Sequence, residues 1–182
     1  MLSGNARKRQ SAMFQSSDVP APANYFLKPG YIFVPSKPTV VSTVLGSCVA
    51  VVLWDRKRKT GGINHFQLPT YQKPDPPTAR YGDASTVMLI RMMMEDGSKP
   101  KHLEAQIFGG AYNNDVSSKN VGRENIRIAR KILARHEIRV VSEDVGGERG
   151  RKIIFDSAAN EVAVLKVDRL RKGDWHPYVD DR

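Results

Sequence analysis

The chain has 182 residues, of which 40% are apolar and 26% charged, a composition typical of one globular domain with a sizeable core. The only cysteine, Cys48, cannot form an internal disulfide, which excludes a secreted disulfide scaffold and favours a reducing compartment; we expect a cytoplasmic protein. The formal charge of +10 comes from bases scattered along the chain without interleaved aromatic residues. We therefore expect a solvated basic surface and no nucleic-acid partner.

Neither a signal peptide nor a membrane span is expected. Residues 1–20 carry a basic cluster with no apolar run after it, and we interpret them as a flexible tail. The longest uncharged stretch, residues 38–54, is short for a bilayer and contains serine, threonine and glycine. We predict a single domain over residues 21–170, without membrane insertion, followed by a C-terminal tail at 171–182.

The domain begins with residues 19–34, where three prolines stand among large apolar groups; they predict an ordered, extended segment lying on the domain. Runs rich in β-branched residues, bounded by glycine, proline or charged turns, then predict strands. These runs cover residues 38–45, 48–55, 62–69, 102–111, 139–147, 151–156 and 160–167.

Two segments predict helices. The first begins near Asp83, a good N-cap, and ends at Gly97; its methionines, 88 and 92–94, are expected to fill the core. The second covers residues 118–138, with a shared face made by Val121, Asn125, Ile128, Ala129 and Ile132. The order of strands, helix, strand, helix and strands predicts an α/β or α+β fold with a mixed sheet.

Cys48 and His65 are the candidate catalytic pair. Most free cysteines are buried and inert, and most histidines in apolar strands are core residues. However, Gly46 and Ser47 directly precede Cys48, and a bend there would expose backbone N–H groups suited to an oxyanion. A hairpin between the two strands would place thiol and imidazole side by side.

A histidine base usually needs a third group to orient its ring. Ser42 and Thr43 carry hydroxyls on the preceding strand, and only one of them can face the Cys48–His65 pair because neighbours in a strand point to opposite faces. The other histidines, His102, His136 and His176, lack a glycine context and are expected at the surface or in the tail. Their scatter predicts no metal site, and we expect no cofactor.

The motifs together resemble a known family. "STVLGSCVAVVLWD" (42–55), "GGINHFQLP" (61–69), "FGGA" (108–111), "VGRENI" (121–126) and "EDVGGERGRKIIF" (143–155) are similar to the CheD family of chemoreceptor glutamine deamidases. The resemblance implies a mixed β-sandwich flanked by helices, shared with deamidating cysteine toxins. It also implies a nucleophile at Cys48 and a histidine at His65.

The resemblance further implies the reaction and its partners. The family's third site residue, which orients the histidine, is a threonine six positions before the cysteine. That position is Ser42 in this sequence, and Thr43 is the alternative. His65 would take the thiol proton, and the Cys48 thiolate would attack a receptor glutamine, releasing ammonia. The expected partners are methyl-accepting chemotaxis receptors and a CheC-type phosphatase. The alternatives are a non-catalytic adaptor that binds receptors or that phosphatase, and a nucleic-acid binder favoured only by charge.

Overall fold

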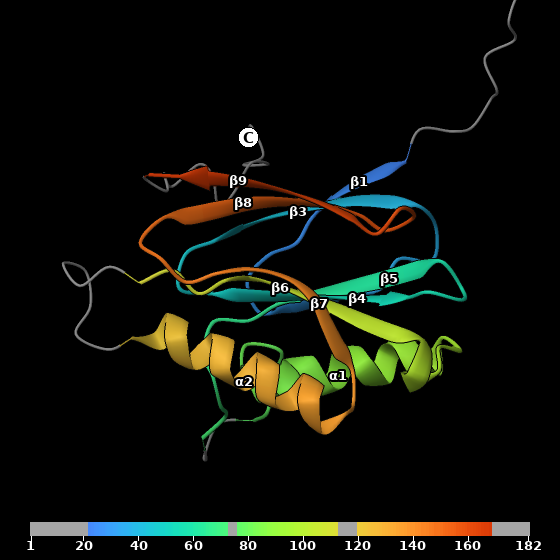
Figure 1. The fold of residues 1–182 in the computed structure, drawn as a ribbon, viewed down its shortest axis with the longest axis horizontal. Helices are drawn as coiled ribbons and strands as arrows, with labels where there is room; N and C mark the ends of the chain where they lie inside the picture. The colour runs from blue at the N-terminus through green and yellow to red at the C-terminus, as the bar shows by residue number, and fades with distance from the viewer. Residues whose placement is uncertain (1–21, 73–75, 113–119, 169–182) are drawn as a thin grey trace, which may run out of the picture.

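The computed structural model of the chain describes residues 22–72, 76–112 and 120–168. Two β-sheets stack on each other, and two helices cover one of them (Figure 1). This is the predicted α+β sandwich flanked by helices. The expected tails at 1–20 and 171–182, together with His176, lie outside the described residues.

The four-stranded sheet has the order β1-β3-β8-β9, and the five-stranded sheet has the order β2-β5-β4-β6-β7. The pairs β1/β3 and β6/β7 are parallel and the other pairs are antiparallel, so both sheets are mixed. The strands are β1 (Ala23–Phe26), β2 (Tyr31–Phe33), β3 (Thr39–Leu45), β4 (Val49–Asp55), β5 (Thr60–His65), β6 (Leu103–Gly109), β7 (Arg139–Val145), β8 (Gly150–Asp156) and β9 (Glu161–Val167).

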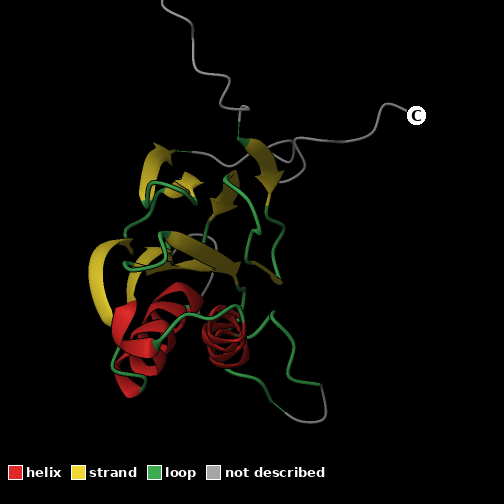
Figure 2. Ribbon diagram, turned by 90° about the vertical axis from the view of Figure 1, so that its right-hand side faces the viewer, coloured by secondary structure: helices red, strands yellow, loops and turns green. Residues whose placement is uncertain are grey.

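The helices α1 (Gly82–Glu95) and α2 (Val121–Arg135) lie on the outer face of the five-stranded sheet, as the view in Figure 2 shows. A short 3₁₀ helix, η1 (Pro100–His102), precedes β6. The molecule therefore has three layers: sheet, sheet and helices. Neither helix in the described ranges is long and apolar enough to cross a bilayer.

Strand β4 is buried along its whole length because it lies in the middle layer. Val49, Val51 and Leu53 pack toward the helices, whereas Ala50 and Val52 pack between the sheets. A strand covered on both faces needs apolar residues at every position, which explains the uninterrupted "VAVVLW" run. Cys48 precedes this strand and belongs to the cluster between the sheets.

From residue 22 on, the segment expected to be extended supplies β1 and β2, which form an edge strand of each sheet. Two expectations need correction. Of the four methionines expected in the core, Met93 is fully buried, but Met88 and Met94 are exposed. The first helix begins near Asp83 as expected, but its N-cap is Tyr81 and not Asp83.

Candidate active site

The turn at 46–48 connects the two sheets, since β3 ends at Leu45 in one sheet and β4 begins at Val49 in the other. Ser47 is exposed and the Cys48 side chain is 9% exposed. The nucleophile candidate therefore lies at one end of the sandwich, directly below the surface.

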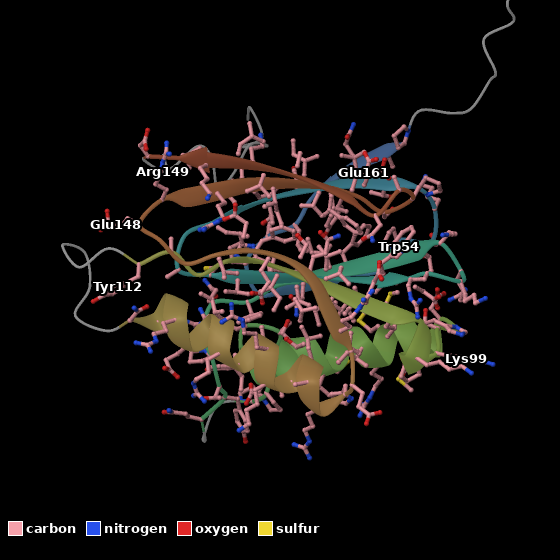
Figure 3. All side chains as sticks on the ribbon, viewed as in Figure 1. Trp54, Lys99, Tyr112, Glu148, Arg149 and Glu161 are labelled. Atoms are coloured by element: carbon pink, nitrogen blue, oxygen red, sulfur yellow. The ribbon has the colours of Figure 1, made fainter. Side chains whose placement is uncertain are left out.

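Other loops meet this turn at the same end of the molecule. The backbone N–H of Ala111 donates to the Gly46 carbonyl (2.8 Å), and that of Tyr112 donates to the Gly147 carbonyl (2.8 Å). Figure 3 shows Tyr112 at this end, together with Glu148 and Arg149 of the β7–β8 loop. The segments 110–112 and 146–149 therefore border the site.

All three carbonyls of the turn are hydrogen-bonded. Besides the Gly46 carbonyl, the Ser47 carbonyl accepts from Asn125 Nδ2 (2.9 Å) and the Cys48 carbonyl accepts from the Gly110 N–H (2.8 Å). In a trans peptide the C=O and the following N–H point in opposite directions. The N–H groups of Ser47 and Cys48 therefore point away from β6 and α2. Two adjacent N–H groups directed this way, beside a thiol, have the form of an oxyanion hole.

His65 ends β5, which pairs with β4 as the predicted hairpin. The register Val52↔Ile63 continues at the isolated bridge Val49↔Phe66, whose backbone bonds are 3.0 and 2.9 Å. This register places His65 opposite Ala50. Since Cys48 precedes Ala50 by two residues, it is the diagonal neighbour of His65 on the same face, at about 7–8 Å or somewhat less between Cβ atoms.

Thr43, not Ser42, contacts the histidine. The Thr43 Oγ1 lies 2.8 Å from His65 Nδ1 and donates its own proton to the Leu27 carbonyl (2.7 Å). A hydroxyl has one proton to donate, so it must accept from Nδ1–H. Nδ1 therefore carries the proton of the neutral ring, and Nε2 has a free lone pair. Ser42 is half-buried and, one residue earlier in the strand, faces the other side of its sheet.

Both side chains are uncharged at neutral pH. Burial lowers the pKa of His65 to about 4, although the Leu27 carbonyl acts in the opposite direction. Burial raises the pKa of the Cys48 thiol to about 11, and the N–H of Cys48 itself opposes this effect. The His65 Nε2 is buried without a hydrogen-bond partner among the described residues. The Cys48 thiol is therefore not hydrogen-bonded to Nε2, and the resting state is a neutral thiol and a neutral imidazole, not an ion pair.

Glycines hold β6 and α2 close to the turn. Gly109 and Gly110 have φ of +103° and +68°, a region that side chains rarely adopt, and a Cβ at Gly109 would overlap the Cys48 carbonyl oxygen. A Cβ at Gly122 of α2 would approach the Gly110 and Ala111 carbonyl oxygens to 2.5 and 2.6 Å. The "FGGA" and "VGRENI" motifs therefore allow close backbone contact behind Cys48.

The glycines of β5 have a different role from Gly46 in the turn before Cys48. Gly61 and Gly62 lie inside β5, where an added Cβ would meet the Leu53 carbonyl or the side chains of Val34 and Leu89 at 3.0 Å or less. They permit dense packing of the strand and do not bend it at the histidine.

Sequence reasoning placed Asn125 on a helix face without a chemical role. Its side chain is fully buried, and Nδ2 donates both to the Ser47 carbonyl and to the Gln67 carbonyl, each at 2.9 Å. It thus ties the turn before β4 to the segment after His65. The available signal was a polar residue among the apolar ones of a core-facing helix stripe.

The other described histidines lie elsewhere. His136 is exposed at the end of α2, and half-buried His102 precedes Leu103, which pairs with Asp55 at the far end of β4 from Cys48. The described part of the chain has no group of three or more side chains suited to a metal ion. A surface cavity of about 430 Å³ lies between α1, α2, Tyr71 and residues 77–79, and neither Cys48 nor His65 lines it.

Comparisons with known proteins agree on one family. Residues 67–166 match the family model described as CheD chemotactic sensory transduction. A probable chemoreceptor glutamine deamidase CheD of Sulfurimonas denitrificans is 37% identical over 147 residues, 79% of this chain and 94% of that protein. Proteins with the same description are 40% identical in Geobacter sulfurreducens (CheD 2; 79% of this chain, 90% of that one) and in Thermococcus kodakarensis (74% and 87%). The chain therefore belongs to the CheD family.

Proposed function

We propose that this protein is a chemoreceptor glutamine deamidase that uses Cys48 as nucleophile and His65 as base. The observation that carries the proposal is the chain of contacts from Leu27 through Thr43 to His65, which leaves Nε2 as an unprotonated base on the side of the ring away from Thr43. The described relatives carry this activity in their names. Their substrate class, the glutamine side chains of chemoreceptors, is the one we assign to this chain.

The first half-reaction forms a thioester. As the Cys48 Sγ attacks the side-chain carbonyl carbon of glutamine, its proton moves to His65 Nε2. Because both groups rest uncharged, this transfer accompanies the attack and no stable thiolate precedes it, in contrast to the sequence-based mechanism. The N–H groups of Ser47 and Cys48 stabilise the oxyanion. The C–N bond then breaks, the proton passes from Nε2 to the leaving nitrogen, and ammonia departs.

The second half-reaction restores the enzyme. Water attacks the thioester carbonyl carbon while His65 Nε2 takes its proton, and collapse of the intermediate expels the Cys48 sulfur, which recovers the proton. The product is a glutamate side chain. Throughout, Thr43 accepts the Nδ1–H and stabilises the imidazolium that forms in each step. Because the nucleophile must remain a reduced thiol, we assign the reaction to the cytoplasm.

The test is direct. Wild-type protein and Cys48→Ala and His65→Ala variants, each shown to be folded by circular dichroism, are incubated with cytoplasmic receptor fragments, and peptide mass spectrometry follows amide-to-acid conversion. We expect conversion with the wild type alone. Conversion that persists in Cys48→Ala would exclude Cys48 as the nucleophile. Receptor binding without conversion by the wild type would favour the non-catalytic adaptor.

Regulation by a CheC-type phosphatase belongs to the same proposal, on the strength of the family resemblance. A phosphatase that covers the Cys48 end of the sandwich should inhibit deamidation in proportion to the complex formed. Titration of a CheC-type protein into the deamidation assay measures this. Unchanged rates at saturating phosphatase would remove it as an inhibitor.

A further inference from the structure

Asn125 donates a hydrogen bond to the peptide group between Ser47 and Cys48, in the turn that carries the proposed nucleophile. The Ser47 carbonyl that accepts from Asn125 Nδ2 belongs to the same planar unit as the N–H of Cys48. Rotation of that unit would turn the Cys48 N–H away from the thiol and from any oxyanion beside it. The hydrogen bond from Asn125 opposes this rotation, and it also polarises the peptide so that its N–H becomes a stronger donor.

The second bond from Asn125 reaches the other half of the site. Its acceptor, the Gln67 carbonyl, lies two residues after His65, and Phe66 between them pairs with Val49 directly after Cys48. One amide group thus holds the segments that carry nucleophile and base. Both Nδ2 protons are used in these bonds, so no smaller or apolar side chain can replace them.

Apart from these two bonds, an asparagine at position 125 destabilises the fold. The residue is fully buried on a helix stripe whose neighbours Ile128, Ala129 and Ile132 belong to the apolar core, and its Oδ1 is buried without a hydrogen-bond partner among the described residues. A buried amide oxygen without a partner destabilises the fold. An apolar residue would avoid this cost, so the two donated bonds must account for the asparagine.

We propose that Asn125 is a positioning residue for the oxyanion hole: it holds the Ser47–Cys48 peptide so that the Cys48 N–H faces the developing negative charge. The inference rests on the deamidase function proposed above. It assigns Asn125 an effect on kcat and little effect on KM, because the oxyanion forms only after the substrate is bound.

The experiment compares two reactions of the same thiol. Deamidation passes through an oxyanion, whereas alkylation of Cys48 by iodoacetamide is a displacement at carbon that forms none. The variants are Asn125→Ala, which removes both bonds, and Asn125→Asp, which keeps the size and, when protonated, one donor. Leu133→Ala is the matched control: it opens a cavity about two turns further along α2, away from the turn. Urea unfolding measures the stability of each variant.

We expect Asn125→Ala to lower kcat on the order of 10- to 100-fold, less than the 100- to 1,000-fold typical when an oxyanion donor is deleted outright. Its KM and its alkylation rate should remain within about twofold of wild type. Leu133→Ala should keep the wild-type kcat despite lower stability. Asn125→Asp should retain more activity than Asn125→Ala and lose it as the pH rises, because the ionised carboxylate cannot donate to either carbonyl. If Asn125→Ala does not fold, Asn125→Asp takes its place in every comparison.

Three results would overturn the inference. If the wild type deamidates the receptor fragment and both Asn125 variants keep the wild-type kcat, Asn125 is not a positioning residue. Equal losses in deamidation and alkylation would show that Asn125 maintains only the general fold around Cys48. An inactive wild type would refute the proposed function itself and, with it, the role of Asn125.

Discussion

Replacing Thr43 by valine tests the orientation of His65, the proposed base. Thr43→Val keeps the shape of the side chain but removes the hydroxyl that accepts from His65 Nδ1 and donates to Leu27. The ring then loses the hydroxyl that holds its proton on Nδ1. The same hydroxyl no longer supports the imidazolium that forms in the transition state.

The magnitude follows from the hydrogen bond that is lost. A bond to a charged group contributes about 1.5–3 kcal/mol, and it reaches that strength only when His65 is protonated during the reaction. Each 1.36 kcal/mol changes a rate tenfold, so we expect kcat to fall about 10- to 100-fold. The Leu27 carbonyl, left buried without its donor, should lower the free energy of unfolding by about 1–3 kcal/mol.

The assay is steady-state ammonia release from a receptor fragment, with urea unfolding on the same samples. Ser42→Ala is the matched control, because its hydroxyl faces the other side of the sheet; its kcat should stay within about twofold of wild type. If Ser42→Ala loses activity and Thr43→Val does not, the assignment of the third residue is wrong and the one implied by the family spacing is right.

Further predictions concern charge and packing. The free energy of unfolding should fall by about 3 kcal/mol from pH 6.5 to 4, because the unfolded chain protonates His65 and the folded one resists it. It should fall by about 2 kcal/mol from pH 9 to 11, because Cys48 ionises first in the unfolded chain; a flat profile in urea melts at these pH values would contradict the pKa shifts. Alkylation of Cys48 should be slow at pH 7 and accelerate only as the pH approaches 11, whereas a plateau reached below pH 7 would indicate a resting thiolate. Gly109→Ala should lower the free energy of unfolding by about 2–5 kcal/mol in the same melts, since its Cβ overlaps the Cys48 carbonyl oxygen. Gly146→Ala, where φ is also positive but the space is open, should lower it by about 1–2 kcal/mol; equal losses would show that backbone strain alone matters.

Local patterns predicted most of the fold. The β-branched runs around Gly46 and the stripe of α2 identified their elements because a strand and a helix have fixed side-chain periods. The failures concern partners distant in sequence. The residues of β1 and β2 do not themselves indicate that the two strands join different sheets. Likewise, the sequence around Met88 and Met94 does not indicate that these side chains face solvent.

The candidate site was predicted in part for the same reason. Cys48 directly precedes one strand of a hairpin and His65 ends the other, so their position at the same end of the hairpin could be inferred from spacing. The choice between Ser42 and Thr43 depends on which face of β3 meets the other sheet, and the contacts of Asn125 depend on how α2 packs against the turn. Both are properties of the assembled layers, which no local pattern contains.

The most direct measurement for the central claim is the intact mass of the protein after rapid mixing with a glutamine-containing receptor peptide and an acid quench. The account predicts a transient thioester adduct that maps to Cys48, forms in the wild type and is absent in Cys48→Ala. Deamidated peptide produced at the full wild-type rate with no adduct at Cys48, or with the adduct on another residue, would contradict it.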